Sequence, residues 1–228
     1  MDLAAAVAPT TLAGQRTLPV LDPLQPLLPE GGLVRGRAVA CQGIAATSLT
    51  LALAAGATQA GAWLAVVDVP WLGVEAAAEL GVPLERVVRV EVPGDAVAWA
   101  DLVAATVDGF EVVITRVPRR IAPGVLRRVQ ARVQAKEAVL LVLGDPGLLA
   151  VDVTMRASRA AWDGVEQGAG YLRGRRVTVA ASGRRVPRPR RAALWLPGPG
   201  GGVAARDEVG ARDDGAPVAV EPVLRSVG

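Results

Sequence analysis

The sequence has no histidine, one cysteine and very few aromatic residues. Without histidine, a Ser-His-Asp triad and any histidine-ligated metal are excluded. Cys41 cannot form an internal disulfide or a cysteine-based zinc site, and its apolar neighbours favour a buried thiol in a reducing cytosol. Aromatic residues make up 3% of the 228 positions, so the core must be built from Ala, Val and Leu.

Lysine is almost absent too, because Lys136 is the only one among 25 basic residues. Abundant Arg, Ala, Gly, Val and Pro together indicate a GC-rich coding sequence, which weakens a functional reading of the arginines. The net charge is only +3, so charge alone does not argue for nucleic-acid binding.

Membrane-spanning segments and a signal peptide are not indicated. Gln59, Asp68 and Pro70 interrupt the Ala/Leu-rich region before it reaches the roughly 20 apolar residues that a span needs. The N-terminus lacks a basic segment followed by an apolar one. We therefore expect a cytoplasmic protein with no membrane contact.

Apolar runs alternate with helical patterns through the first two thirds of the chain. This alternation predicts an α/β fold with an open, mostly parallel sheet flanked by helices. The expected strands are 38–42, 62–68, 87–92, 111–117 and 138–143. The expected helices begin near Thr47, cover 74–80, run from an Asp95 cap to about 107, and begin at Pro123.

After residue 145 the pattern changes to strands without helices. Expected strands at 149–157, 159–165, 172–180 and 191–196 should extend the sheet as antiparallel hairpins, with turns at Gly168, Gly170 and Ser182–Gly183.

Composition divides the chain into one folded domain with two tails. Residues 1–25 are expected to be a mostly extended or disordered arm, 26–196 the core domain, and 197–228 a disordered tail rich in Gly, Pro and charge. Prolines at 19, 23, 26 and 29 argue against a regular helix in that region. It should lie extended and anchor to the core through Leu24, Leu27 and Leu28.

The stretch 31–56 organises the chain, because a glycine turn, an apolar strand, a tight loop at Gly43 and a helix follow one another. This order is typical of nucleotide phosphate sites. A working P-loop has the pattern G-x-x-x-x-G-K-[ST], whose Lys reaches the β- and γ-phosphates. Residues 43–48 (GIAATS) lack both the second glycine and the lysine. For Gly43, Thr47 and Ser48 a tight turn and helix cap is the simpler reading.

Several phrases in this order resemble the RecA-type ATPase core over roughly residues 28–196. They are GGLVRG, SLTLALAAGATQAGAWLAVVD and AAELGVPLERVVRV. With the later RRVPRPRR and LWLPG, the sequence looks most similar to the actinobacterial ImuA-prime group of RecA-like mutasome factors. The resemblance implies a RecA-like core domain.

The resemblance also implies where catalytic residues should lie. The P-loop lysine would fall near Ala46, and the Mg²⁺-binding hydroxyl would be Thr47 or Ser48. The strand-end acid would follow Asp68, where the sequence has Val-Pro, and the Walker B aspartate would fall at Arg116. A positive charge ~4 Å from a metal ion costs several kcal/mol at intermediate dielectric.

The P-loop lysine, the strand-end acid and the Walker B aspartate all serve ATP hydrolysis, and all three are missing. We therefore predict a pseudo-ATPase with no catalytic residue, cofactor or metal. Gly43, Thr47, Ser48 and Asp68 would then form a vestigial loop. The resemblance implies a non-catalytic scaffold in DNA-damage-induced translesion synthesis (the SOS response and mutagenesis). Its implied partners are an inactive Y-family polymerase homologue and an error-prone C-family polymerase complex. Two alternatives stay open: an ATP-binding RecA/RadA-like recombination ATPase, and a SulA-like cell-division inhibitor.

Arginines crowd a segment free of acidic residues, and two tryptophans are candidate interface anchors. The arginines suggest a surface for the DNA backbone or a protein partner, although a solvated hairpin is an equal alternative. No aromatic residue lies between 173 and 191, so base stacking is not indicated. The candidates are Arg173, Arg175, Arg176, Arg184, Arg185, Arg188, Arg190, Arg191, Trp71 and Trp195.

Overall fold

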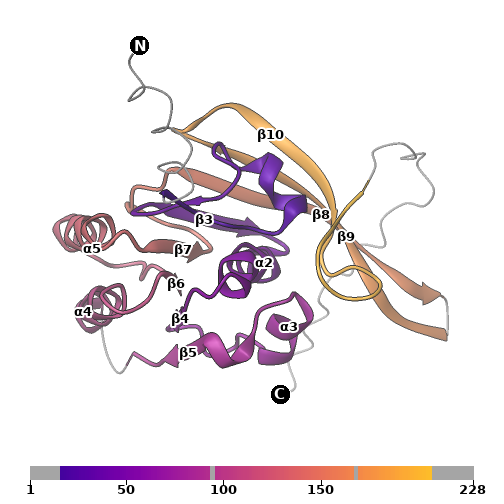
Figure 1. The fold of residues 1–228 in the computed structure, drawn as a ribbon, viewed down its shortest axis with the longest axis horizontal. Coiled ribbons are helices and arrows are strands. Elements are labelled where there is room, and N and C mark those ends of the chain that lie inside the picture. The colour runs from indigo at the N-terminus through magenta and orange to yellow at the C-terminus, as the bar shows by residue number, and fades with distance from the viewer. Residues whose placement is uncertain (1–15, 93–95, 167–168, 207–228) are drawn as a thin grey trace, which may run out of the picture.

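A computed structural model describes residues 16–92, 96–166 and 169–206, and within them one nine-stranded sheet dominates (Figure 1). Its strand order is β11-β10-β9-β8-β3-β7-β6-β4-β5. Strands β3 to β8 pair in parallel, and β8 to β11 pair antiparallel. The predicted fold class is therefore confirmed. The strands are β3 (Ala38–Gly43), β4 (Leu64–Val67), β5 (Val87–Val90), β6 (Val112–Thr115), β7 (Val139–Leu143), β8 (Val153–Glu166), β9 (Ala169–Gly183), β10 (Val186–Trp195) and β11 (Ala204–Ala205).

Helices cover both faces of the parallel strands (Figure 1). On one face α2 (Ala46–Gln59) and α3 (Val74–Glu79) pack, and on the other α4 (Ala96–Thr106) and α5 (Pro123–Ala135). Side chains alternate across β3, so Cys41 joins the cluster with α2 while Ala40 joins the cluster with α4 and α5. Burial on both faces explains why these strands are continuous apolar runs.

The proline-rich segment is helical where an extended chain was predicted. Asp22–Leu27 forms the 3₁₀ helix η2, with Pro23 in its first turn, where a missing N–H leaves no bond unmade. The predicted anchors Leu24, Leu27 and Leu28 are buried, as expected. Beside η2, the short strands β1 (Thr17–Leu18) and β2 (Leu33–Val34) form a small second sheet.

Two strands predicted at 149–157 and 159–165 are one strand, β8. Its beginning pairs in parallel with β3, whereas an antiparallel hairpin was predicted there. The expected break is only a bulge, where Arg159 has φ of 50° and the register shifts between Ser158 and Ala161. Because β8 does not turn there, β8 and β9 run on together past the end of β3 as a long two-stranded ribbon.

The packed structure reaches beyond residues 26–196 on both sides. Leu18 and Val20 belong to the core, and β11 pairs with the end of β10. The predictions for residues 1–15, the Asp95 cap, the Gly168 turn and the tail after Arg206 lie outside the described residues. Among those that are described, no helix is long and apolar enough to cross a membrane.

Candidate functional site

The junction between β3 and α2 lies where the direction of strand order reverses in the sheet. β7 and β8 flank β3, and open α/β sheets bind ligands outside the carboxyl ends of strands at such a switch point. Only Ile44 and Ala45 separate the strand from the helix. The structure thus places the predicted loop at the position where a phosphate cradle would lie.

The loop itself is tied to the neighbouring strand β8. Gly43 has φ of 94°, and a Cβ there would lie 1.9 Å from the Ala157 carbonyl oxygen. The same oxygen accepts a hydrogen bond of 3.3 Å from the Ile44 N–H. Gly43 is therefore required because the backbone of β8 passes too close for any side chain. The Ile44 N–H is thus used within the fold, and the two-residue loop is shorter than the glycine-rich loop of a working P-loop.

The first turn of α2 carries Thr47 and Ser48, the two hydroxyls that the resemblance assigns to Mg²⁺. The Ser48 hydroxyl accepts a hydrogen bond of 2.6 Å from the guanidinium of Arg175 on β9. Arg175 also donates to the Leu196 carbonyl at 2.7 Å and lies over the Trp162 ring at 5.1 Å. Burial lowers the pKa of Arg175, and Glu79 partly opposes this effect. One predicted metal-binding hydroxyl is thus already bound to a cation.

A second cation stands at the end of β6, the strand next to β4. Arg116 lies over the ring of Trp71 at 4.9 Å, while Asp68 is exposed at the end of β4 with φ of 56°. Stacking on Trp71 holds Arg116 at the carboxyl edge of the sheet, where the resemblance places the Walker B aspartate. Throughout residues 16–92, 96–166 and 169–206, no group of three or more Cys, Asp or Glu side chains could hold a metal ion.

A hollow of about 650 Å³ opens beside this second cation, between the chain segments that follow β6 and β7. Arg116, Arg119 and Asp145 supply its charge, and Leu148 stands 73% exposed at its border. Arg119, Asp145 and Leu148 were not predicted as site residues. The signal was their position directly after two buried strands that end at the same edge.

The predicted arginines do not form one surface. Arg173, Arg175 and Arg176 lie near the outer end of β9, and the turn to β10 carries Arg184 and Arg185 at the other end of the sheet. The remaining three, Arg188, Arg190 and Arg191, follow along β10.

Several of these arginines are engaged in contacts within the chain. Arg190 donates to the carbonyls of Pro26 and Leu28 at 3.1 and 2.6 Å and so holds η2 on the sheet. Arg176 pairs with Asp163 at 2.7 Å. These contacts give both arginines a structural role.

Two aromatic rings from outside residues 173–191 accompany the arginines on the ribbon. Trp162 pairs across the strands with Arg175, and Arg173 lies over the Tyr171 ring at 5.0 Å. The alternation of Tyr171, Arg173 and Arg175 at every second position was the available signal, because such residues share one strand face. The two candidate tryptophans are far apart. Trp71 follows β4, whereas Trp195, stacked with Arg206, ends β10, and five strands lie between β4 and β10.

Residues 26–147, just over half of the chain, match the family model of the MT3502 N-terminal domain. The chain belongs to the MT3502 N-terminal domain family. No curated protein matches it. The MT3502 match includes Gly43, Ser48, Asp68 and Arg116, so the whole β3–α2 junction is part of the family domain. Arg175, which donates a hydrogen bond to the Ser48 hydroxyl, lies beyond the matched residues.

Proposed function

We propose that the chain is a non-catalytic, RecA-like accessory protein that acts by binding other proteins in damage-induced translesion synthesis. One observation carries its non-catalytic part: guanidinium groups stand at two positions that the sequence resemblance assigns to metal binding. Arg175 is bound to the Ser48 hydroxyl, and Arg116 is stacked on Trp71 at the end of β6.

Phosphoryl transfer depends almost entirely on positioning and electrostatic stabilisation by a lysine, a metal and a water-orienting residue. The sequence has Ala46 where the lysine is expected, and Val69 where a strand-end acid is expected. Val69 is 1% exposed, so this position holds a core side chain and no carboxylate. Two cations in place of metal ligands repel Mg²⁺, and no lysine anchors the phosphates.

A partner-binding role is supported by the exposure of large apolar groups at the same edge. Ile44, Trp71 and Leu148 are 64%, 54% and 73% exposed, in loops that follow three parallel strands. Trp and Arg are enriched at the energetic centres of protein interfaces, and Trp71 and Arg116 are already stacked on each other. The identity of the partners, an inactive Y-family polymerase homologue and an error-prone C-family polymerase complex, rests on the resemblance to the ImuA-prime group.

The test is a pull-down of the full chain with the Y-family-like polymerase homologue from the same genome, with and without ATP and magnesium. We expect equal capture in both conditions, because no step needs nucleotide. Capture only with ATP would contradict the non-catalytic role. No capture in either condition would show that the polymerase homologue is not a partner. Binding to the tubulin-like division protein would instead favour the SulA-like alternative.

A further inference from the structure

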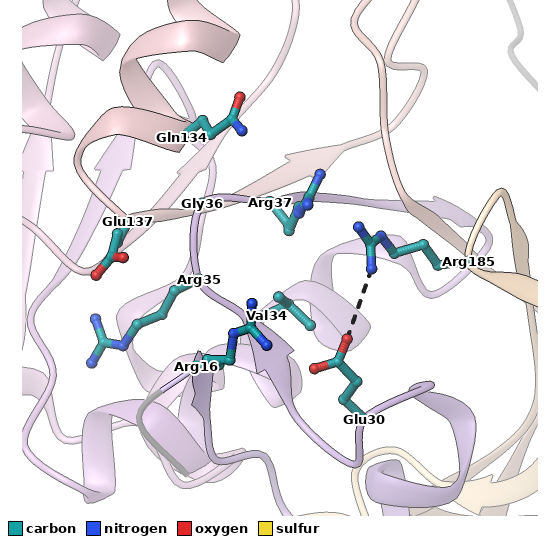
Figure 2. A pocket seen from close by; sticks show the side chains of 9 residues that line it. All are labelled: Arg16, Glu30, Val34, Arg35, Gly36, Arg37, Gln134, Glu137 and Arg185. Carbon is teal, nitrogen blue, oxygen red and sulfur yellow. Dashed lines mark ion pairs between the residues drawn. The ribbon is translucent and has the colours of Figure 1, made fainter. Parts of the chain in front are cut away.

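A second hollow, of about 570 Å³, lies at the amino ends of the parallel strands, opposite to the β3–α2 junction (Figure 2). Its cations come from three separate segments: Arg16 before β1, Arg35 and Arg37 around the turn into β3, and Arg185 between β9 and β10. We propose that this pocket binds a doubly charged phosphate group. The proposal is independent of the proposed scaffold function.

The charges of the pocket do not balance. Four guanidinium groups line it against two carboxylates, Glu30 and Glu137. Behind the lining, Arg184 and Asp152 add one charge of each sign, so the excess is two positive charges. Neither Arg16 nor Arg35 has a side-chain hydrogen bond or ion pair with any described residue, whereas Arg185 lies 3.9 Å from Glu30. A phosphomonoester carries about −1.5 to −2 charges at pH 7, which matches this excess better than a single carboxylate or phosphodiester does.

A buried carboxylate holds two of these arginines in place. Asp152, whose side chain is 8% exposed, lies 3.9 Å from Arg37 and 3.6 Å from Arg185, with Arg184 also at 3.6 Å. Because Asp152 already positions two guanidinium groups, their side chains lose less conformational entropy when a ligand binds. At Gly36, with φ of 73°, an added Cβ would lie only 3.3 Å from the Gln134 backbone, so the turn packs closely against that wall.

The side chains of Arg16, Arg37 and Arg185 surround Val34 in the middle of the pocket, whereas Arg35 extends towards Glu137 (Figure 2). Guanidinium groups from three segments that line one hollow suit a tetrahedral anion with several acceptor oxygens. Glu30 lies below Arg185 and is joined to it by the ion pair drawn there (Figure 2). The Glu30 carboxylate therefore competes with the proposed ligand.

The test is calorimetric titration of the full chain at low ionic strength with inorganic phosphate, and with pyrophosphate as a more highly charged probe. Removing a charged hydrogen-bond donor in Arg16→Gln or Arg37→Gln should weaken binding roughly 10- to 100-fold. Removing the competing carboxylate in Glu30→Gln should strengthen binding, by roughly threefold. The matched control is Arg89→Gln, an exposed arginine on β5 at the far edge of the sheet.

A 5′-phosphorylated oligothymidine and its unphosphorylated form distinguish a terminal nucleic-acid phosphate from a free phosphate compound. Arg16→Gln keeps the test valid if Arg37→Gln fails to fold, because Arg16 has no ion pair to lose among the described residues. Equal loss in Arg89→Gln would show only diffuse attraction and would overturn the proposal. Failure of phosphate, pyrophosphate and both oligonucleotides to bind would also overturn it, as would binding of a glutamate-rich peptide alone.

Discussion

Arg175 donates a hydrogen bond of 2.6 Å to the hydroxyl of Ser48, a residue 127 positions earlier in the sequence. This bond joins the antiparallel ribbon to the first turn of α2, at the edge where the resemblance places a nucleotide. The same guanidinium is fixed by the Leu196 carbonyl and the Trp162 ring, so it is held in place by three partners. A structural contact thus fills a position to which the resemblance to RecA-type ATPases assigns a metal ligand.

We predict that Gly43→Ala strongly destabilises the fold, because its Cβ would lie 1.9 Å from the Ala157 oxygen at φ of 94°. The matched control is Gly61→Ala, where φ is 103° and no atom lies within 4 Å of the added Cβ. Gly61→Ala should cost roughly 1–2 kcal/mol from backbone strain alone. Gly43→Ala should cost at least roughly 2 kcal/mol more, as overpacking does. Urea unfolding measures both, and equal losses would show that β8 does not confine the loop.

We predict that Arg190→Ala lowers the free energy of unfolding by roughly 1–3 kcal/mol, because two carbonyl oxygens lose a charged donor. The control Arg188→Ala removes an exposed arginine two positions away on the same strand, and should change stability by less than roughly 0.5 kcal/mol. Limited proteolysis should also cut near η2 faster in Arg190→Ala. Similar stabilities for the two variants would contradict a structural role for Arg190.

Some features could be read from the sequence because they depend on local pattern. The apolar run at 138–143 predicted β7 to within one residue, and Pro123 marked the first residue of α5. The 3₁₀ helix at Asp22–Leu27 was missed because four prolines disfavour an α-helix without excluding a tighter one. The continuity of β8 was missed because it depends on one left-handed residue, Arg159, at a bulge.

The site was less predictable than the fold, because it joins residues distant in sequence. Gly43, Ser48 and Arg116 could be placed at the carboxyl edge from strand order alone. The contact between Ser48 and Arg175 could not, since it requires β9 to return beside β8 and β3. The basic pocket at Arg16, Arg37 and Arg185 was missed for the same reason.

Alkaline pH should reveal the buried thiol. Burial raises the pKa of Cys41 from 9.0 to about 12, and a hydrogen bond with Thr50 only partly opposes this. Between these values the unfolded chain loses the proton while the folded chain keeps it, so the stability contributed below pH 9.0 is progressively lost as pH rises. The loss approaches ~1.4 kcal/mol per pH unit.

Urea unfolding of the wild type and Cys41→Ala at pH 7, 9 and 10.5 isolates this effect, because the other titrating groups are common to both. We expect the free energy of unfolding to fall more in the wild type than in the variant above pH 9. If it fell equally in both from its value at pH 7, Cys41 would ionise normally in the folded chain.

Trp71 and Trp63 offer a direct comparison for partner binding, because they lie after and before the same strand, β4. They are 54% and 42% exposed, and each stacks with an arginine, at 4.9 and 5.7 Å. If the carboxyl edge docks the polymerase homologue, Trp71→Ala should weaken capture by at least roughly tenfold, as the loss of a hot-spot residue does. Trp63→Ala should leave capture unchanged. If both variants or neither lost capture, the carboxyl edge would not be the interface with the polymerase homologue.

The most direct measurement is magnesium-dependent phosphate release from ATP by the purified full chain, alongside Ala46→Lys and Thr47→Ala. We predict no turnover above the buffer blank for all three chains. Introducing the lysine alone leaves Arg116 where the resemblance places the Walker B aspartate, and Val69 where it places the strand-end acid. Turnover by the wild type that disappears in Thr47→Ala would contradict the central claim and make the β3–α2 junction an active site.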